Sequence, residues 1–309
     1  MDREAVSPVE ARYDEYVISD SAGVPVVHPA QALGDPIAIV SFRVGLADEA
    51  IPDRGLTHLA EHRALQPYLQ TAESWDDTTQ AFANGTTGST ITRFTCTGTR
   101  AGIEEFVGRL SDEIAQLAEG VDEGELHLEA RILGAESRLR DGSAWANLYS
   151  DLYGASRLGM AAISEAALFD LDPERLRAWV ARNFARQNCA VALTFPPSGD
   201  LGLGALPSGT WQEPPDFLPN HHQLPAYRPR PGPVMFAAPV RRRIGNGTLA
   251  AILRRSLMQR LRSEDGVSYA PSASYDPLSR EWALISGMFD VADEDARGRS
   301  RPSPNCSID

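Results

Sequence analysis

The sequence predicts an α+β protein with two related mixed α/β domains, of which the second is shortened. Three observations lead to this prediction. Apolar and alternating runs that favour strands are interleaved with stretches of helical periodicity. A segment rich in proline and glycine, residues 198–233, shows no sustained periodicity and divides the chain. After this segment, a strand, a helix and further strands follow in an order similar to that near the N-terminus.

The composition is that of a globular protein with an excess of acidic residues. The chain has 309 residues, of which 42% are hydrophobic and 23% charged, so there is room for two domains with cores of their own. Its net charge of −13 argues against a nucleic acid or an anionic membrane surface as the main partner. Charge alone identifies no substrate.

Cysteine content and hydropathy predict a soluble cytoplasmic protein. Cys96, Cys189 and Cys306 are too few and too scattered for a disulfide framework or a cysteine metal cluster, so we expect reduced thiols. The N-terminal segment is charged and lacks the apolar stretch of a signal peptide. No later run is long enough to span a bilayer.

The first predicted domain, residues 12–197, begins with strands. These are expected at residues 16–19, 24–28 and 37–44. The last of them is rich in apolar and β-branched residues, which predicts a strand buried on both faces. A polar loop, 48–54, then leads to a helix that begins at Gly55.

The remainder of this domain alternates between strands and helices. Residues 80–96 are rich in threonine and contain glycine, which predicts strands around a turn and an exposed sheet edge. Apolar spacing predicts helices over 101–117 and 122–140. Asp172-Pro173-Glu174 is typical of a helix start, and 188–195 is typical of a buried strand.

The second predicted domain, residues 234–292, follows the linker. We expect a strand at 234–240, a helix at 248–262 and strands at 268–275 and 281–291. The tail, residues 293–309, is charged and then rich in arginine, serine and proline, which predicts disorder.

Two histidines four residues apart form the clearest chemical motif. His58 and His62 lie on one face if this segment is helical, with Glu61 between them in the sequence. The order H-x-x-E-H is the reverse of the commoner H-E-x-x-H zinc motif, and both place a carboxylate beside the metal as a general base. The motif therefore predicts two metal ligands and a base.

A catalytic zinc site typically has a third protein ligand, and the helix predicted over 122–140 offers candidates. Glu129 and Glu136 are seven residues apart, which is close to two helical turns, so they share a face. The same helix also carries Glu123, Glu125 and His127. Spacing alone does not select among these side chains.

The stretch from Gly45 to His62, GLADEAIPDRGLTHLAEH, resembles the zinc-site region of the insulinase/pitrilysin (M16-type) metallopeptidase family, which includes the mitochondrial processing peptidases. The resemblance implies the mitochondrial processing peptidase/LuxS-like metallohydrolase fold. That family follows H-x-x-E-H with two glutamates seven residues apart, of which the second binds zinc. In this sequence the resemblance implies a Zn²⁺ site with the ligands His58, His62 and Glu136, the general base Glu61 and the accessory catalytic carboxylate Glu129.

Three further stretches resemble the same family. Asn84-Gly85-Thr86-Thr87 is similar to the N-A-x-T of the edge strand that binds substrate peptides by strand addition, which implies that Asn84 and Thr87 bind substrate. Residues 175–195 resemble the closing helix and strand of the domain, including Asn188. Arg262 and Tyr269 match an R-x6-Y signature of the second domain, where this pair contacts substrate.

The sequence also departs from the family. Arg63-Ala64-Leu65 replaces the bulkier apolar run that usually follows the second histidine. Only 76 residues follow Pro233, fewer than a usual domain of ~100–150 residues. The tail from Gly298 resembles nothing in the family. The resemblance thus covers residues 12–197 and part of 234–292.

These observations predict a zinc-dependent metalloendopeptidase that hydrolyses peptides or unfolded chains with a metal-activated water and Glu61 as general base. The resemblance further implies a homodimer or a heterodimer with a second M16-type chain. The alternative is a non-catalytic or partner-dependent subunit of an M16-type peptidase complex, because the second domain is too small to close a chamber alone. A zinc hydrolase with a non-peptide substrate is a third hypothesis.

Each motif also has a simpler explanation. H-x-x-E-H arises by chance on surface helices, and paired glutamates are commonly a solvated face. Arg262 at a helix end interacts favourably with the helix dipole, and Tyr269 fits a core position. The remaining histidines are expected on the surface or in loops rather than at a metal; they are His28, His127, His221 and His222.

Overall fold

The computed structural model describes residues 16–69, 81–120, 122–140, 144–154, 157–160, 165–215 and 233–290. Its contacts divide the chain into two compact units, which are described separately. Unit 1 contains Met1–Gly45, Gly55–Gly134 and Ala167–Glu213. Unit 2 contains Leu46–Arg54, Ala135–Ala166 and Pro214–Asp309.

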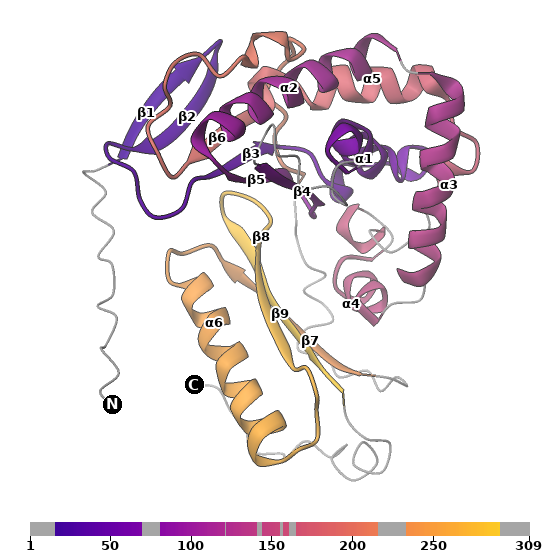
Figure 1. The fold of residues 1–309 in the computed structure, drawn as a ribbon. Helices are drawn as coiled ribbons and strands as arrows, with labels where there is room; N and C mark the ends of the chain where they lie inside the picture. Colours follow the sequence, from indigo (N-terminus) through magenta and orange to yellow (C-terminus); the bar gives the residue numbers. More distant parts are fainter. Residues whose placement is uncertain are drawn as a thin grey trace. The chain divides into compact units, whose positions relative to one another are not determined.

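A six-stranded mixed sheet forms the centre of unit 1 (Figure 1). Its strands are β1 (Tyr16–Ser21), β2 (Val24–Pro29), β3 (Ile37–Phe42), β4 (Ala81–Thr87), β5 (Thr92–Gly98) and β6 (Cys189–Leu193). They lie in the order β1-β2-β6-β3-β5-β4, and every neighbouring pair is antiparallel except β2 with β6. The α+β class with a mixed sheet is therefore confirmed.

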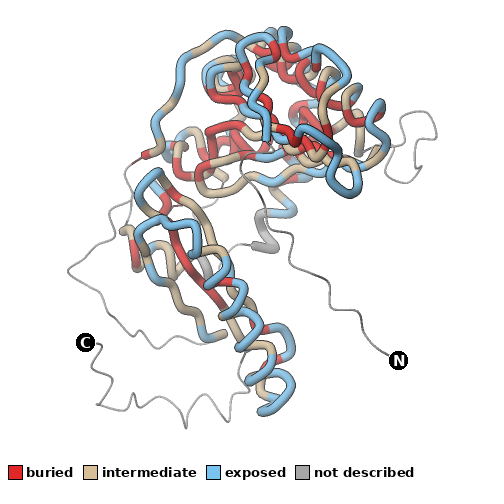
Figure 2. The backbone as a smooth tube through the Cα atoms, turned by 90° about the vertical axis from the view of Figure 1, so that its left-hand side faces the viewer, coloured by how far each residue is buried: buried red, intermediate tan, exposed pale blue. Residues whose placement is uncertain are grey.

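Helices cover one face of this sheet. They are α1 (Leu56–Leu69), α2 (Arg100–Glu119) and α5 (Pro173–Asn183), and the chain between α2 and α5 includes α3 (Glu123–Arg140). Alternate strand residues such as Val40, Phe42 and Phe94 are buried in the core with apolar side chains of α1, α2 and α5. These buried stretches are red in Figure 2. The Phe42 and Phe94 rings meet edge to face, with centroids 6.0 Å apart.

Unit 2 contains a three-stranded antiparallel sheet in the order β7-β9-β8. Its elements are α4 (Ala144–Tyr153), β7 (Val234–Arg241), α6 (Asn246–Leu257), β8 (Ser272–Pro277) and β9 (Trp282–Phe289). A small core unites Ala47, Leu152, Leu158, Leu278 and Leu284. The predicted second domain, related to the first, is not evident among the described residues, because unit 2 has three strands where unit 1 has six.

Most predicted elements of the chain are present, with shifted ends. The strand expected from residue 268 begins at Ser272, and the helix expected over 248–262 begins at Asn246. This helix changes after Leu257 into a π-helical segment, Met258–Glu264. Short 3-10 turns occur at Leu46–Asp48, Ile51–Asp53, Arg157–Met160, Ala166–Leu168, Arg186–Asn188 and Leu203–Ala205.

One expectation about solvent exposure is corrected, and the predicted linker contains buried residues. His28, expected at the surface, is buried, and its Nδ1 lies 2.9 Å from the carbonyl oxygen of Pro29, which can only accept a hydrogen bond. In the segment expected to be a linker, Leu201, Leu203 and Leu206 are buried in the core of unit 1. Residues 216–232, with His221 and His222, and the tail from residue 291 lie outside the described residues.

Cys96 and Cys189 are buried thiols without a disulfide. Burial raises the pKa of the Cys96 thiol to about 12, and it also raises the pKa of Cys189. Both thiols are therefore protonated and unreactive at neutral pH. No helix within the described residues combines the length and apolar character that crossing a membrane requires.

Gly45 lies where the chain leaves β3 and passes against the β4–β5 turn. A Cβ atom there would lie 2.5 Å from the carbonyl oxygen of Gly88 and 2.6 Å from the amide nitrogen of Thr90. Both neighbours are backbone atoms that cannot rotate away. The close approach also fixes the turn that ends β4, the edge strand of the sheet.

We expect Gly45→Ala to lower the free energy of unfolding by about 1–3 kcal/mol, the usual cost of overpacking. Urea denaturation checks this value. Gly134→Ala is the matched control, because Gly134 lies inside α3 and a Cβ there meets nothing within 4 Å. The control should be about 1 kcal/mol more stable than the wild type, since alanine favours helix. Equal stability of the two variants would contradict the packing at Gly45.

Candidate metal centre

The entry to α1 is fixed by a left-handed glycine and a buried ion pair. Gly55 has φ +102, a conformation that other residues rarely adopt, and its carbonyl oxygen accepts the first helical hydrogen bond from Leu59 N at 2.9 Å. In the preceding loop Arg54 is 1% exposed, and its Nη1 lies 3.3 Å from Glu49 Oε2 and donates to Leu46 O at 2.9 Å. Gly55 thus marks the start of the helix that carries the histidine motif, and the Arg54 contacts order the loop before it.

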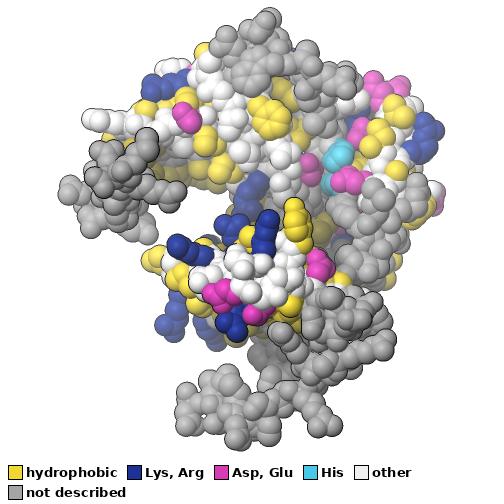
Figure 3. Space-filling model, turned by 60° about the horizontal axis from the view of Figure 1, so that its bottom comes forward, with side chains coloured by type: hydrophobic (Ala, Val, Ile, Leu, Met, Phe, Trp, Pro, Cys, Tyr) yellow, Lys and Arg dark blue, Asp and Glu magenta, His cyan; other side chains and the backbone are white. Residues whose placement is uncertain are grey.

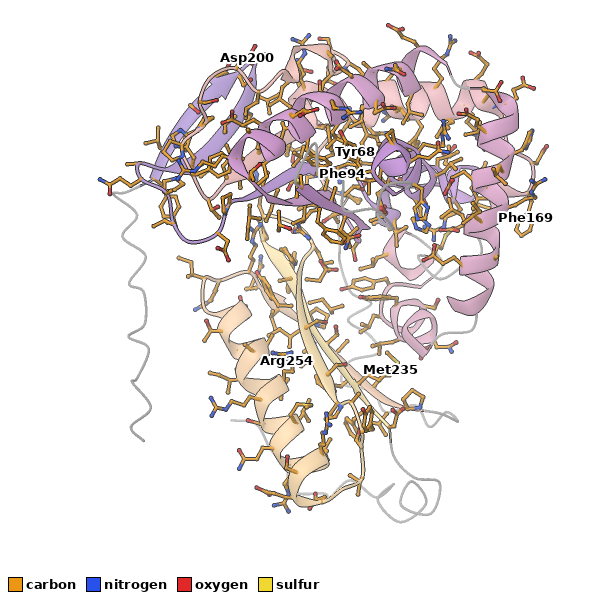
Figure 4. All side chains as sticks on the ribbon, in the orientation of Figure 1. Tyr68, Phe94, Phe169, Asp200, Met235 and Arg254 are labelled. Carbon is orange, nitrogen blue, oxygen red and sulfur yellow. The ribbon has the colours of Figure 1, made fainter. Side chains whose placement is uncertain are left out.

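The motif lies in a helix that is buried on most sides. His58 and Glu61 are each 6% exposed, and His62 is half-buried. The two imidazole rings have centroids 4.7 Å apart and stand nearly perpendicular to each other. At the far end of α1 the ring of Tyr68, labelled in Figure 4, packs at 4.9 Å against Phe106 of α2. Buried ionisable groups in such a helix need polar partners.

Glu136 of α3 completes a group that can hold a metal ion. Ligand atoms of His58, His62 and Glu136 all lie within 4.8 Å of one another. Tetrahedral zinc with bonds of ~2.1 Å holds its ligand atoms roughly 3.4 Å apart, so a slight closing of this group suffices. Two imidazoles and a carboxylate are also a donor set that divalent metals accept. On the face shown in Figure 3, histidine side chains lie next to acidic ones.

Glu129, which lies on α3 like Glu136, contacts His62 of α1. Its Oε1 lies 2.9 Å from His62 Nδ1, and Glu129 is 7% exposed. An ionised carboxylate only accepts hydrogen bonds, so Nδ1 carries the proton and Nε2 keeps its lone pair for a metal. Carboxylates hold metal-binding imidazoles in this way in many metal sites. Glu129, predicted as an accessory catalytic carboxylate, is thus placed to orient the His62 ring.

Glu61 faces the edge strand β4. Thr87 Oγ1 donates a hydrogen bond of 2.9 Å to Glu61 Oε2, and a Cβ atom on Gly85 would lie only 2.1 Å from Glu61 Oε1. The absence of a side chain at Gly85 therefore makes room for the carboxylate. Sequence reasoning did not assign Gly85 a role. The sequence does mark this position, because glycine stands where the family's N-A-x-T pattern has alanine.

The other predicted site residues have different surroundings. Asn84 is exposed, and its Oδ1 accepts a hydrogen bond of 2.9 Å from the amide of Gly85. Arg262 and Tyr269, both in unit 2, lie together, with the guanidinium carbon 4.9 Å from the ring centroid and Tyr269 79% exposed. Tyr269 is therefore not a core residue.

The alternative ligands on α3 do not join the metal group. Glu123, Glu125 and His127 are exposed, as is Glu136, so position along the helix and not exposure separates them from the group. Glu125 instead forms an ion pair with Arg63, with Nη2 2.7 Å from Oε2. Among the described residues, His58, His62 and Glu136 form the one such group of three potential ligands.

The comparisons with known proteins show the fold. No family model and no curated protein matches the sequence. A protease from Helicobacter pylori matches with a TM-score of 0.65 and 12% identity, over 90% of this chain and 75% of that one. Pitrilysin matches with a TM-score of 0.59 and 15% identity, over 96% of this chain and 36% of the pitrilysin chain. An inactive domain of peptidase M16 from Pseudomonas fluorescens matches with a TM-score of 0.65 and 15% identity, over 89% of this chain and 74% of that one.

The chain therefore has the fold of M16 peptidases. Because a protease and an inactive domain match equally well, the fold does not decide whether this chain is catalytic. That question rests on the side chains of α1, α3 and β4.

We expect the two glutamates of α3 to differ in their effect on metal affinity. Glu136→Ala removes a ligand and should nearly abolish Zn²⁺ binding, whereas Glu129→Ala should weaken it about 10–100-fold, as loss of a ligand's orienting partner does. Competition with a chromophoric chelator measures both. Glu123→Ala, in the first turn of the same helix, is the control and should bind Zn²⁺ like the wild type. Wild-type affinity in Glu136→Ala would exclude it as a ligand.

Proposed function

We propose that the chain is a zinc-dependent metalloendopeptidase of the M16 type that hydrolyses peptides or unfolded chains. The observation that supports this most is the convergence of His58, His62 and Glu136, whose ligand atoms lie within 4.8 Å of one another. The H-x-x-E-H order adds a carboxylate, Glu61, between the two histidines in the sequence.

His58, His62 and Glu136 would hold the zinc, and Glu129 would keep His62 in the right tautomer and orientation. Bound zinc supplies a Lewis acid for the scissile carbonyl and lowers the pKa of water towards ~7. Glu61 takes a proton from the attacking water and delivers it to the leaving amine. Thr87 holds the Glu61 carboxylate through its hydroxyl group, so the base is oriented before substrate arrives.

Strand β4 provides the proposed substrate platform. Among the strands of the described residues it is the last in the sheet order, and it pairs there with β5 alone. An extended peptide can add along its other side through main-chain hydrogen bonds, which favours unfolded or short chains over particular side chains. Asn84 and Thr87 belong to this strand. Arg262 and Tyr269, stacked on each other, are proposed as further substrate contacts.

A second candidate is a partner-dependent or non-catalytic subunit of an M16-type complex in the cytoplasm. The match to an inactive M16 domain favours this alternative, as does the three-stranded sheet of unit 2. The partner would be a second copy of this chain or another M16-type chain. A zinc site that is intact but inactive until the partner is added would fit this hypothesis.

We expect Glu61→Gln to bind Zn²⁺ with wild-type stoichiometry and to lose 10²–10⁴-fold in peptide hydrolysis, because the amide cannot accept the proton. A quenched fluorescent peptide and metal analysis measure the two properties on one preparation. Glu123→Gln should change neither, since Glu123 is exposed and remote from the motif in sequence. Retained turnover in Glu61→Gln would refute the role of Glu61.

Partner dependence is tested on the wild-type chain. If the chain is a complete peptidase, turnover in the activity assay should be linear in protein concentration. Native mass spectrometry identifies the oligomeric species present in the same samples. If it works as half of an assembly, turnover should rise more steeply than linearly with concentration or appear only when a second M16-type chain is added. Zinc binding without turnover under all these conditions would favour the non-catalytic alternative.

A further inference from the structure

Arg63, the residue after the second histidine, is a buried arginine. Its side chain is 9% exposed, and arginine is rarely buried without a partner. This position departs from the M16 resemblance, in which a bulkier apolar run follows the second histidine. An apolar residue would suit the buried position without any partner, so the contacts of the guanidinium are informative.

The guanidinium of Arg63 connects two helices. Nη2 lies 2.7 Å from Glu125 Oε2 on α3, and Nη1 donates to Gln66 Oε1 on α1. Glu113 on α2 is close enough to respond to its charge: burial raises the pKa of Glu113, and Arg109 and Arg63 oppose that rise. A planar fork with several donors can make such contacts together, whereas lysine offers a single point charge.

This ion pair lies beside the contact between His62 and Glu129. Arg63 follows His62 on α1, and Glu125 precedes Glu129 by four residues, or about one turn, on α3. Two neighbouring polar contacts thus join the same pair of helices. Glu136 lies eleven residues after Glu125, about three turns along α3, and therefore on the same face.

The apolar packing of α3 only weakly determines how far the helix is shifted along its own axis relative to α1. Over Glu123–Glu136, the buried apolar side chains are Leu126, Ala130 and Leu133, a single stripe. Leu128 and Ile132 are 48% and 49% exposed. Apolar contact is not directional, so a narrow stripe permits small shifts along and about the helix axis. Hydrogen-bonded ion pairs have strict distances and exclude such shifts.

We propose that Arg63 is a positioning residue, which through Glu125 holds α3 in register against α1 so that Glu136 reaches the metal group of His58 and His62. This proposal rests on the proposed metal site and adds to it a determinant particular to this chain. Arg63 contacts neither metal nor substrate. Its contribution is to lower the reorganisation that α3 undergoes when a metal binds.

The test is a double-mutant cycle on the full chain with the Zn²⁺ dissociation constant as the readout. Glu125→Ala should weaken zinc binding on the order of 10-fold, in the range seen when support of a metal ligand is lost. Arg63→Met should weaken it by a similar factor, and Arg63→Lys by less. The double variant Arg63→Met/Glu125→Ala should be no weaker than the worse single variant, since both remove the same contact.

Two controls separate positioning from general stability. Glu125→Ala leaves the buried Arg63 guanidinium without its carboxylate and should lower the unfolding midpoint of the metal-free protein, whereas the double variant Arg63→Met/Glu125→Ala leaves no unpaired charge and should recover the midpoint while zinc affinity stays low. Glu105→Ala removes the exposed ion pair of Arg109 and Glu105 within α2 and should change neither property. If Arg63→Met does not fold, Glu125→Ala and Arg63→Lys still decide the question.

The possible failures are distinguishable. Wild-type zinc affinity in Glu125→Ala would overturn the positioning role and leave the metal site standing. A fall in zinc affinity that only parallels a loss of stability in the metal-free protein would also overturn it. A wild-type chain that binds no Zn²⁺ at all would overturn the metal site itself, and this proposal with it.

Discussion

The site depends on one constraint: ionisable side chains buried together on α1 must find partners on neighbouring elements. His58, Glu61 and Arg63 are nearly inaccessible to solvent, and an unpaired buried charge costs several kcal/mol. Thr87 of β4 provides the partner for Glu61, and Glu125 of α3 provides the partner for Arg63. Satisfying these groups thus fixes how α1 packs against both elements, and the metal group follows from that packing.

Short sequence patterns predicted the features of this fold that depend on neighbouring residues in the chain. Alternation and β-branched runs identified the strands, and the polar, threonine-rich composition of 80–96 identified an exposed edge, which β4 is. The H-x-x-E-H spacing placed two imidazoles on one helical face. The spacing of Glu129 and Glu136 predicted a shared face but not which carboxylate reaches the histidines, because that depends on the distance between helices rather than on periodicity.

The features that were missed depend on tertiary contacts. His28 is buried because the main chain beside it supplies a hydrogen-bond acceptor, and nothing in its local sequence indicates this. Leu201, Leu203 and Leu206 lie in a segment whose prolines and glycines suggested a linker, yet their side chains fill the core of unit 1. Composition describes the freedom of the unfolded segment, whereas burial depends on the surface that the folded sheet and helices leave open.

The meeting of α1 and β4 depends on particular side chains and not on the fold alone. Identities of 12–15% leave the backbone similar and the side chains largely free to differ. At Gly85 the strand passes so close to Glu61 that a methyl group and the carboxylate cannot occupy their present positions together. Alanine here would require the flexible Glu61 side chain to shift, and the hydrogen bond from Thr87 would have to adjust with it. In this conformation the glycine, the threonine and the glutamate are therefore compatible as a set, and the position of the Glu61 carboxylate depends on both residues of β4.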